Sequence, residues 1–210
     1  MPIDLAELIR PAHTALVLQE CQEGVIGAES ALPELAAAAR REMLPNAARL
    51  ARAAREAGAR VIHCTAAVRP DGFGSNANAR LFQHARRSPV KLLPGTRAVA
   101  VVPEIGVEPA DLVLTRLQGL SPFAHSELDA LLRNAGIRTL VLAGVSVNVA
   151  IQNLAFDAVN AAYQVVIPRD AVAGWPQEYV EMVFAHTLGA VSTLTRTDAV
   201  LDAWRYAPAP

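Results

Sequence analysis

The sequence predicts an α/β fold in which a doubly wound, mostly parallel sheet carries helices on both faces. Short apolar runs with little polar alternation recur along the chain, as is typical of strands buried on both faces of a parallel sheet. Helically spaced segments of roughly ten to fifteen residues separate these runs, which favours right-handed strand–helix–strand crossovers. The chain has 210 residues, 52% of them apolar, which suffices for one buried core. We therefore expect a single domain across residues 1–210.

Five apolar runs are the expected strands: residues 15–18, 60–64, 112–115, 139–143 and 164–167. Small apolar residues at helical spacing predict a helix over residues 44–57, with Gly58 placed as its C-cap. Ser126 is a good N-cap for a helix over residues 127–133, which Gly136 would close. Further helices are expected over residues 150–162, 176–188 and 197–204.

A long segment without strong periodicity, residues 65–103, separates the second expected strand from the third. A loop of this length inside a compact domain is more often a binding lid or an interface arm than a plain connection. Gly72 and Gly74 could act as its hinges. The tail over residues 205–210, which ends Ala-Pro-Ala-Pro, is expected to be frayed.

Composition excludes several classes of function. The net charge of −1 offers no electrostatic basis for binding nucleic acid or an anionic membrane. No uncharged apolar run approaches the roughly 18–20 residues of a membrane span, and the acidic N-terminus lacks the pattern of a signal peptide. The two cysteines form neither a disulfide framework nor a metal-site spacing, which fits a reducing compartment. We therefore expect a soluble, cytoplasmic protein.

Three segments that are distant in sequence carry polar residues at the ends of expected strands. Glu20 follows the first strand, Arg116 follows the third, and residues 146–150 follow the fourth. Ligands of doubly wound sheets bind at the carboxyl ends of the strands, so we expect these segments to meet in one crevice. An unpaired buried charge costs several kcal/mol, which makes Glu20 and Arg116 natural partners there.

Motifs at three places in the chain point to a family. They read Thr14-Ala-Leu-Val-Leu-Gln-Glu-Cys-Gln22, then Asp111-Leu-Val-Leu-Thr-Arg116 with Ser121-Pro-Phe123 and Glu127-Leu-Asp129, and Val141-Leu-Ala-Gly-Val-Ser-Val-Asn-Val-Ala150. The first resembles an opening strand that ends Asp-x-Gln, the second a middle strand with a Ser-Ala-Phe loop, and the third a Gly-Val-x-Thr-Asn-Val-Cys turn. Together they resemble the isochorismatase-like hydrolases, also called the cysteine hydrolase superfamily. The resemblance covers most of the chain and implies the same three-layer α/β fold.

By this resemblance, the catalytic positions hold altered residues. Glu20 occupies the position of the family's Asp, and Ala150 that of the nucleophilic Cys, so catalysis must proceed without a thioester. Counting forward along the middle strand puts Arg116 in the role of the family's Lys, whereas counting back from Ser121 gives Leu117. We place Arg116 there. The triad Asp, Lys and Cys thus becomes Glu, Arg and Ala.

The resemblance also implies a binding pocket around these positions. The substrate-binding candidates are Gln22, Ser121, Phe123, His125, Val145, Ser146 and Asn148. A non-proline cis peptide is implied between Val145 and Ser146, where backbone amides, including that of Ala150, would form an oxyanion hole. Asn148 is expected to hold the backbone of this turn.

Glu20 suits the role of a general base, since a neighbouring Arg116 favours its ionised form. Arg116 cannot release a proton, so it either orients Glu20 or binds an anionic group of the substrate. The alternative for both residues is a plain salt bridge that joins two loops. Ser146 and Cys64 are weaker candidates for a substitute nucleophile, because neither has a recognisable base beside it. Cys21 should point to the face opposite Glu20.

No metal or other cofactor is expected. The five histidines show no pairing at metal-ligand spacing. Nicotinamidase relatives carry an Asp-x-His metal motif after the second strand, where this chain reads Thr65-Ala-Ala-Val-Arg-Pro70. His63 lies within an apolar strand and is expected to be a hydrogen-bonded core residue.

Two functions of different class remain open. In the first, the chain is a hydrolase that acts on a small polar or anionic metabolite without a thiol, with Glu20 activating water or transferring a proton. True isochorismatases resemble this chain in lacking the Cys, and they cleave a vinyl ether with the Asp as acid. In the second, the chain is an inactive family member that serves as a small-molecule-binding or assembly subunit. The Ala-rich helices, and assembly through flanking helices in the family, predict a homodimer or larger homo-oligomer.

Overall fold

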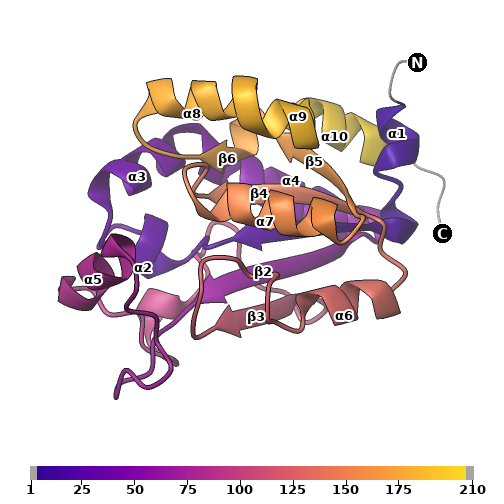
Figure 1. The fold of residues 1–210 in the computed structure, drawn as a ribbon. Helices are drawn as coiled ribbons and strands as arrows, with labels where there is room; N and C mark the ends of the chain where they lie inside the picture. The colour runs from indigo at the N-terminus through magenta and orange to yellow at the C-terminus, as the bar shows by residue number, and fades with distance from the viewer. Residues whose placement is uncertain (1–3, 207–210) are drawn as a thin grey trace.

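A mostly parallel sheet of seven strands forms the centre of the molecule and confirms the predicted fold class (Figure 1). The computed structural model describes residues 4–206. The strand order is β3-β2-β1-β4-β5-β7, with the short β6 paired to β4. The strands are β1 (Thr14–Gln19), β2 (Arg60–Ala66), β3 (Leu112–Arg116), β4 (Thr139–Val145), β5 (Gln164–Pro168), β6 (Val172–Ala173) and β7 (Thr193–Thr195). Each of the five expected strands is present and slightly longer than its apolar run.

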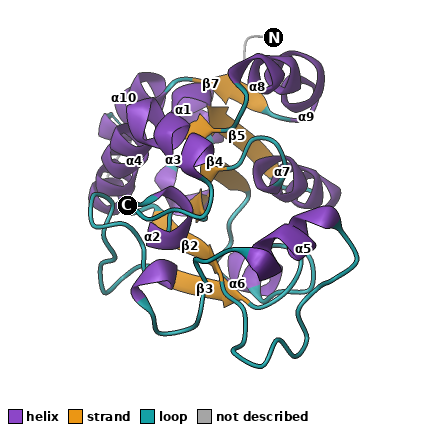
Figure 2. Cartoon of the chain, turned by 90° about the vertical axis from the view of Figure 1, so that its left-hand side faces the viewer, coloured by secondary structure: helices purple, strands orange, loops and turns teal. Residues whose placement is uncertain are grey.

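Helices cover both faces of the sheet, as the end-on view in Figure 2 shows. The α-helices are α1 (Leu5–Leu8), α2 (Glu23–Ile26), α3 (Pro33–Ala38), α4 (Leu44–Ala57), α5 (Arg80–Arg87), α6 (Leu128–Asn134), α7 (Ala150–Asn160), α8 (Gln177–Val183), α9 (Gly189–Val191) and α10 (Thr197–Arg205). Two π-helical turns, η2 (Ala39–Met43) and η5 (Phe184–Leu188), extend α4 and α8, and the 3-10 turns are η1 (Pro11–His13), η3 (Arg97–Val99) and η4 (Arg169–Ala171).

The two faces of the sheet bury two separate apolar cores. Leu16 and Leu18 of β1 point into the core beneath α4 and α10, whereas Ala15 and Val17 point into the core beneath α6, α7 and α8. All four side chains are buried, because successive residues of a strand point to opposite faces and both faces are covered. This explains why the strands read as unbroken apolar runs.

The expected helices form with small shifts at their ends. α4 spans the expected residues, and Gly58 ends it with a φ of 78°, a left-handed conformation that glycine adopts without steric cost. α6 begins one residue later than predicted, so its N-cap is Glu127 and not Ser126, although the Ser126 hydroxyl still accepts a hydrogen bond from the Leu128 amide at 3.1 Å. α10 continues through Arg205, so this first residue of the expected frayed tail is helical, while residues 207–210 lie outside the described part of the chain.

The segment over residues 65–103 is not purely a loop. It begins with the last two residues of β2, Thr65 and Ala66, and contains α5 and η3. None of the eight residues of α5 is buried, so the helix has no core-facing stripe by which the sequence could reveal it. No helix within residues 4–206 is long and apolar enough to cross a membrane.

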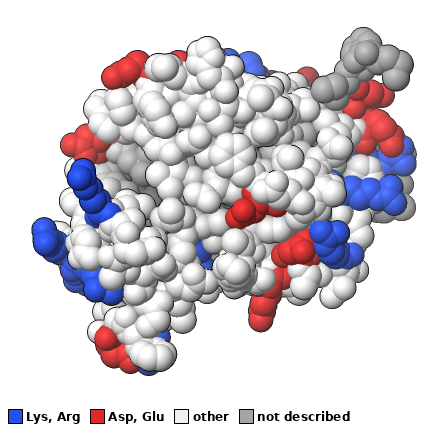
Figure 3. All heavy atoms as spheres, viewed as in Figure 1, with Lys and Arg blue, Asp and Glu red and all other residues white. Residues whose placement is uncertain are grey.

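The space-filling view separates a charged from an uncharged surface (Figure 3). Lys and Arg gather at the left, over α5, whereas charged side chains are sparse between α7 and α8. Exposed apolar side chains occur on these two helices, among them Phe156, Val159, Tyr179 and Met182. Such a surface suits the helix-mediated assembly that we expect for the chain.

Candidate active site

Glu20 and Arg116 meet at the carboxyl edge of the sheet, where the sequence places them. Glu20 follows the last residue of β1, and Arg116 is the last residue of β3. The Arg116 Nη2 donates a hydrogen bond to Glu20 Oε1, and the two side chains are only 12% and 17% exposed. This hydrogen bond places Arg116 beside the carboxylate, whereas the next residue, Leu117, is 40% exposed.

Gln19 is a third member of this cluster that the sequence reasoning did not identify. Its Nε2 donates to the same Glu20 oxygen, Oε1, at 3.0 Å, and its side chain is fully buried. Glu20 Oε2 accepts no hydrogen bond from any residue within 4–206, so one carboxylate oxygen is held and the other is available. The sequence signal that could have identified Gln19 is its place as a polar residue at the end of an otherwise apolar run, directly before Glu20.

The same cluster contains two buried polar atoms that lack partners among the described residues, Gln19 Oε1 and Arg116 Nη1. Buried polar groups are nearly always hydrogen-bonded, and an unsatisfied one costs about 1–3 kcal/mol. One of these atoms is an acceptor and the other is a donor. A ligand that carries both kinds of group would complement them.

The backbone of Glu20 is strained in a way that is typical of functional sites. Its φ is 51°, in the left-handed region, which costs a non-glycine residue about 1–2 kcal/mol. Its amide donates to the Cys64 carbonyl at 2.8 Å, which ties the residue to the end of β2. Gly144 of β4 runs directly alongside, since a Cβ there would lie 2.2 Å from the Gln19 carbonyl oxygen. Glycine at this position therefore lets the turn after β4 approach Glu20.

That turn has the backbone geometry that the resemblance implies. The peptide bond between Val145 and Ser146 is cis. Asn148 ties the turn to the segment after β6, because its Nδ2 donates to the Trp175 carbonyl at 2.6 Å and its Oδ1 accepts from the Trp175 amide at 3.0 Å. Asn148 therefore joins this turn to the backbone of Trp175.

Ala150 is the first residue of α7 and is buried. The Ser146 carbonyl accepts hydrogen bonds from the amides of Val149 and Ile151, at 3.2 and 3.0 Å. The amides of Ser146 and Ala150 donate no hydrogen bond to any residue within 4–206. Free amides at a helix N-terminus carry the positive end of the helix dipole, so they can stabilise a developing negative charge.

Gln22 lies in the loop after β1 and was expected to contact substrate. It is fully buried, and its side-chain amide bonds to both backbone groups of Ala66, accepting from the amide at 2.6 Å and donating to the carbonyl at 2.9 Å. Gln22 therefore joins the ends of β1 and β2 and does not face the crevice.

The Ser121–Phe123 loop also turns its candidate side chains inward. The Ser121 hydroxyl accepts from the Phe123 amide at 3.0 Å, and Phe123 packs edge-to-face on Tyr163 with 5.8 Å between the ring centroids. Both residues are buried. His125 is exposed and has a φ of 60°. Of these three candidates, His125 alone has a side chain that is open to a ligand.

Neither cysteine is placed to act as a nucleophile. Cys21 and Cys64 are both buried, and burial raises the pKa of each thiol to about 12. Since the thiolate is the reactive form, both thiols are inert near neutral pH. The structure therefore does not support Cys64 as a nucleophile.

The segment over residues 65–103 contacts Arg116 and the loop that follows it. The Asn76 side chain accepts from the Gly119 amide at 2.8 Å, and the Ala67 amide donates to the Arg116 carbonyl at 2.9 Å. Between residues 69 and 97 the chain carries six Lys or Arg residues and a single Asp. This local excess of basic residues is not visible in the overall net charge of −1.

No group of three or more His, Cys, Asp or Glu side chains within residues 4–206 could hold a metal ion. His63 is a core residue as expected, with its Nε2 3.0 Å from Asp111 Oδ2. Asp111 in turn accepts from the guanidinium of Arg55. The described residues therefore do not fit the metal site of the nicotinamidase relatives.

Comparison with known families settles the membership of the chain. The model of the isochorismatase domain matches residues 14–199. The chain belongs to the isochorismatase family. A ureidoacrylate amidohydrolase RutB of Methylorubrum extorquens is 32% identical over 170 residues, which are 74% of this chain and 68% of that protein. An uncharacterized isochorismatase family protein of Bacillus subtilis, YwoC, is 31% identical over 101 residues, and the match spans about half of its length, 53%.

Solved structures share the fold over almost the whole chain. A cysteine hydrolase from Pseudomonas syringae pv. phaseolicola is 22% identical with a TM-score of 0.80, and the match covers 96% of each chain. An N-carbamoylsarcosine amidase from Thermoplasma acidophilum is 24% identical with a TM-score of 0.70, over 88% of this chain and 96% of that one. At these identities the similarity establishes the α/β architecture of the family member.

Proposed function

We propose that this family member is a hydrolase that works without a thiol nucleophile, with Glu20 as the general base that activates water. The observation that carries this proposal is the asymmetry of the Glu20 carboxylate. Arg116 and Gln19 both donate to Oε1, whereas Oε2 accepts no hydrogen bond within residues 4–206. A carboxylate held by one oxygen in a partly buried crevice is oriented to take a proton with the other.

The proposed reaction uses Glu20 Oε2 and the backbone amides of Ser146 and Ala150. Glu20 Oε2 takes a proton from water while the water oxygen forms a bond to the carbonyl carbon of the substrate. The amides of Ser146 and Ala150 stabilise the charge that develops on the carbonyl oxygen. Glu20 then returns its proton to the leaving nitrogen as the carbon–nitrogen bond breaks, so one water is consumed and no covalent enzyme intermediate forms.

Ala150 is compatible with this route because it leaves the start of α7 without a reactive side chain. The backbone amide at the position remains, and in this mechanism it is the amide that acts on the substrate. The two cysteines cannot take over the chemistry, since both are buried and their pKa values are raised to about 12.

The expected substrate is a small anionic metabolite. Arg116 Nη1 lacks a partner among the described residues, and the basic segment over residues 69–97 contacts the loop that follows Arg116. Ureidoacrylate and N-carbamoylsarcosine, after which two of the similar proteins are named, both combine a carbamoyl group with a carboxylate. N-carbamoyl acids are therefore the first compounds to test.

A non-catalytic binding subunit is the second candidate. Ala150 at the family's nucleophile position favours it, together with the absence of an accessible thiol among residues 4–206. Such a protein would keep the Glu20–Arg116 pair as a recognition element for the same anionic ligands. Binding without turnover distinguishes it from the hydrolase.

The deciding experiment incubates the purified chain with ureidoacrylate, N-carbamoylsarcosine, further N-carbamoyl amino acids and vinyl-ether carboxylates, and follows products by mass spectrometry. For any compound that is hydrolysed, Glu20→Gln should lower kcat/KM by roughly 10²–10⁴. Glu104→Gln is the matched control, since Glu104 forms a surface ion pair with Arg40. A loss below about threefold in Glu20→Gln would show that the carboxylate is structural. Calorimetric binding of these compounds without any product would support the binding subunit instead.

A further inference from the structure

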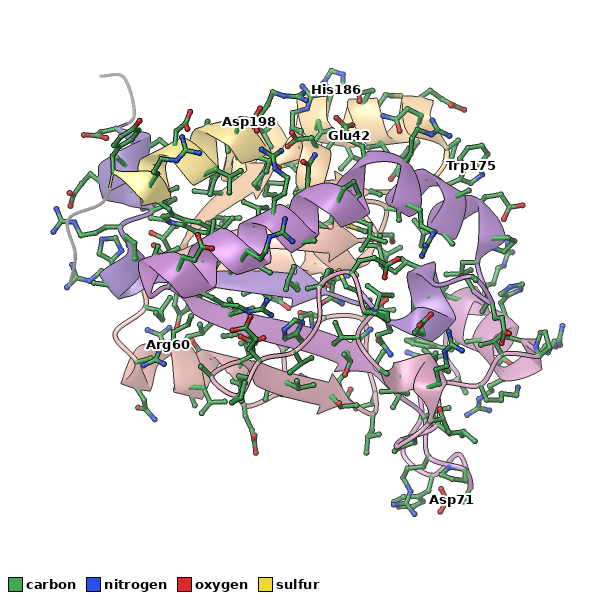
Figure 4. All side chains as sticks on the ribbon, turned by 180° about the vertical axis from the view of Figure 1, so that it is seen from behind. Glu42, Arg60, Asp71, Trp175, His186 and Asp198 are labelled. Atoms are coloured by element: carbon green, nitrogen blue, oxygen red, sulfur yellow. The ribbon has the colours of Figure 1, made fainter. Side chains whose placement is uncertain are left out.

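A second cavity lies at the carboxyl ends of β5 and β7, and none of Glu20, Arg116 and Ala150 lines it. Its volume is about 470 Å³, within the range of small-molecule sites. Its lining comes from three stretches that are distant in sequence: residues 38–43 at the end of α3 and in η2, residues 169–184 in η4, β6, α8 and η5, and Arg196 after β7. Glu42 of η2 is one of the lining residues, and in Figure 4 it lies between the long helix that contains α4 and the C-terminal helices.

The cavity wall is partly apolar. Met43, Val180 and Phe184 line it and are buried in the two cores, and the partly exposed Ala38 also lines it. These side chains provide a surface for an aliphatic or aromatic group but nothing for it to hydrogen-bond. Polar recognition must come from the charged residues of the lining.

Asp170 supplies an anionic group that is incompletely paired. Its side chain is only 7% exposed, and its Oδ1 accepts from the amide and the hydroxyl of Thr197, at 2.8 and 3.0 Å. Its Oδ2 has one cationic neighbour, Arg196, at 3.4 Å, which is longer than the roughly 2.7–2.9 Å of a charge-assisted hydrogen bond. Arg196 is 68% exposed and lies at a similar distance from Glu42. Its positive charge is therefore shared between Asp170 and Glu42.

Arg41 supplies the opposite charge. It lines the same cavity and is exposed, and it forms no ion pair with any residue within 4–206. The other two arginines of the lining are engaged, Arg169 with Glu181 and Arg196 with Glu42 and Asp170. The cavity thus combines a mostly buried carboxylate, whose Oδ2 is paired only at 3.4 Å with the exposed Arg196, and the Arg41 guanidinium, which forms no ion pair within residues 4–206.

We propose that this cavity binds a small zwitterion of the α-amino-acid type with an apolar side chain. The ammonium group would bind Asp170 Oδ2 and the carboxylate would bind Arg41. The side chain would pack on Val180 and Phe184. A ligand with a single charge would satisfy only one of the two groups and would meet repulsion from the other.

Occupancy would place the ligand against the strand that supports the catalytic turn. β6 forms one wall of the cavity and pairs with Gly144 and Val145 of β4. The Ala173 carbonyl of β6 accepts from the Val147 amide at 2.8 Å. The site is nevertheless separate from the crevice, so its test needs no enzymatic activity.

The experiment is calorimetry on the full chain with L-leucine, L-methionine and L-phenylalanine as probes. For leucine the single-charge analogues are 3-methylbutylamine, which lacks the carboxylate, and 4-methylpentanoate, which lacks the ammonium group. We expect an amino acid to bind and each analogue to bind about tenfold more weakly or worse, since each loses one charge-assisted hydrogen bond. Failure of all three amino acids to bind at millimolar concentration, or equal affinity of leucine and its analogues, would overturn the proposal.

Variants then locate the probe. Arg41→Met should lower the affinity for leucine to that of the amine and leave the amine unaffected, whereas Arg52→Met, at an exposed position of α4 outside the cavity, should change neither. Ala38→Phe should place a larger side chain in the lining of the cavity and abolish binding. Glu20→Gln should bind like the unmodified chain, which separates this site from the crevice. Binding that survives Ala38→Phe, or that Arg41→Met lowers equally for leucine and the amine, would contradict the assignment.

Discussion

Glu20 and Arg116 form an ion pair across the carboxyl end of β2, although 96 positions separate them in the chain. Their strands, β1 and β3, are not neighbours, because β2 runs between them. The pair therefore joins the ends of three strands at one point. Both side chains are mostly buried, so removal of either partner would leave a poorly solvated charge, which typically costs about 3–5 kcal/mol.

This geometry predicts different outcomes for two replacements of Arg116. Arg116→Lys should be mild, because an ammonium group can still neutralise Glu20. Arg116→Met should lower both the unfolding free energy and kcat/KM, since Glu20 loses its cation. Urea unfolding and steady-state kinetics measure the two effects. Equal losses in the two variants would show that the guanidinium shape matters more than its charge, including its bond to the Gly119 carbonyl.

Alkylation should leave the native protein active. Cys21 and Cys64 are buried and their pKa values are raised to about 12, so iodoacetamide should modify them slowly until the chain is unfolded. Mass spectrometry of the native and the urea-unfolded protein gives the extent of modification. Inactivation that follows the modification of Cys64, and that substrate prevents, would contradict this prediction and make Cys64 the nucleophile.

Ala150→Cys tests whether the start of α7 can activate a thiol, as the proposed loss of a nucleophile at this position implies. A thiol at the start of α7, beside amides that donate no hydrogen bond within residues 4–206, should have a pKa below its ordinary value of about 8.5. It should react with iodoacetamide faster than the native cysteines and can gain weak amidase activity. Ala130→Cys, at an exposed position of α6, is the control with an ordinary thiol. Equal titration of the two introduced thiols would favour the binding-subunit function.

Stability should fall as pH is lowered through about 6.5, because of His63. Burial lowers the pKa of His63, although its hydrogen bond to Asp111 acts in the opposite direction. The unfolded chain therefore binds a proton that the folded chain resists, so the unfolding free energy decreases by at most about 1.4 kcal/mol per pH unit below the unfolded pKa. The decrease stops once the folded His63 is also protonated.

Asp111 acts in a different pH range. Burial tends to raise the pKa of its carboxyl, but hydrogen bonds from Arg55, the Glu108 amide and His63 outweigh burial and hold it below the usual range. Its contribution is therefore present above about pH 4 and lost below it. Urea unfolding between about pH 5 and 7 isolates the histidine. His63→Gln should flatten this dependence, the exposed His186→Gln should preserve it, and an unchanged slope in His63→Gln would refute the assignment.

Much of the fold could be predicted because the signals are local. A strand buried on both faces must be apolar at every position, and a left-handed helix end favours glycine, so β1 to β5 and Gly58 are readable from the chain. α5 was not predicted because it has no buried face, and β6 was not predicted because two residues are too few to form a pattern. β6 depends on its pairing with β4, which is remote in sequence.

The sequence by itself determined which charged and polar residues stand at strand ends, and hence that Glu20, Arg116 and the turn after β4 share one edge of the sheet. Only the tertiary structure decided how their atoms are engaged. Gln19 bonds to Glu20 while Gln22, three residues later, is committed to Ala66, because the direction of a side chain depends on strand register and packing. The second cavity likewise exists only where three distant stretches of the chain converge, since no single stretch contains both Arg41 and Asp170.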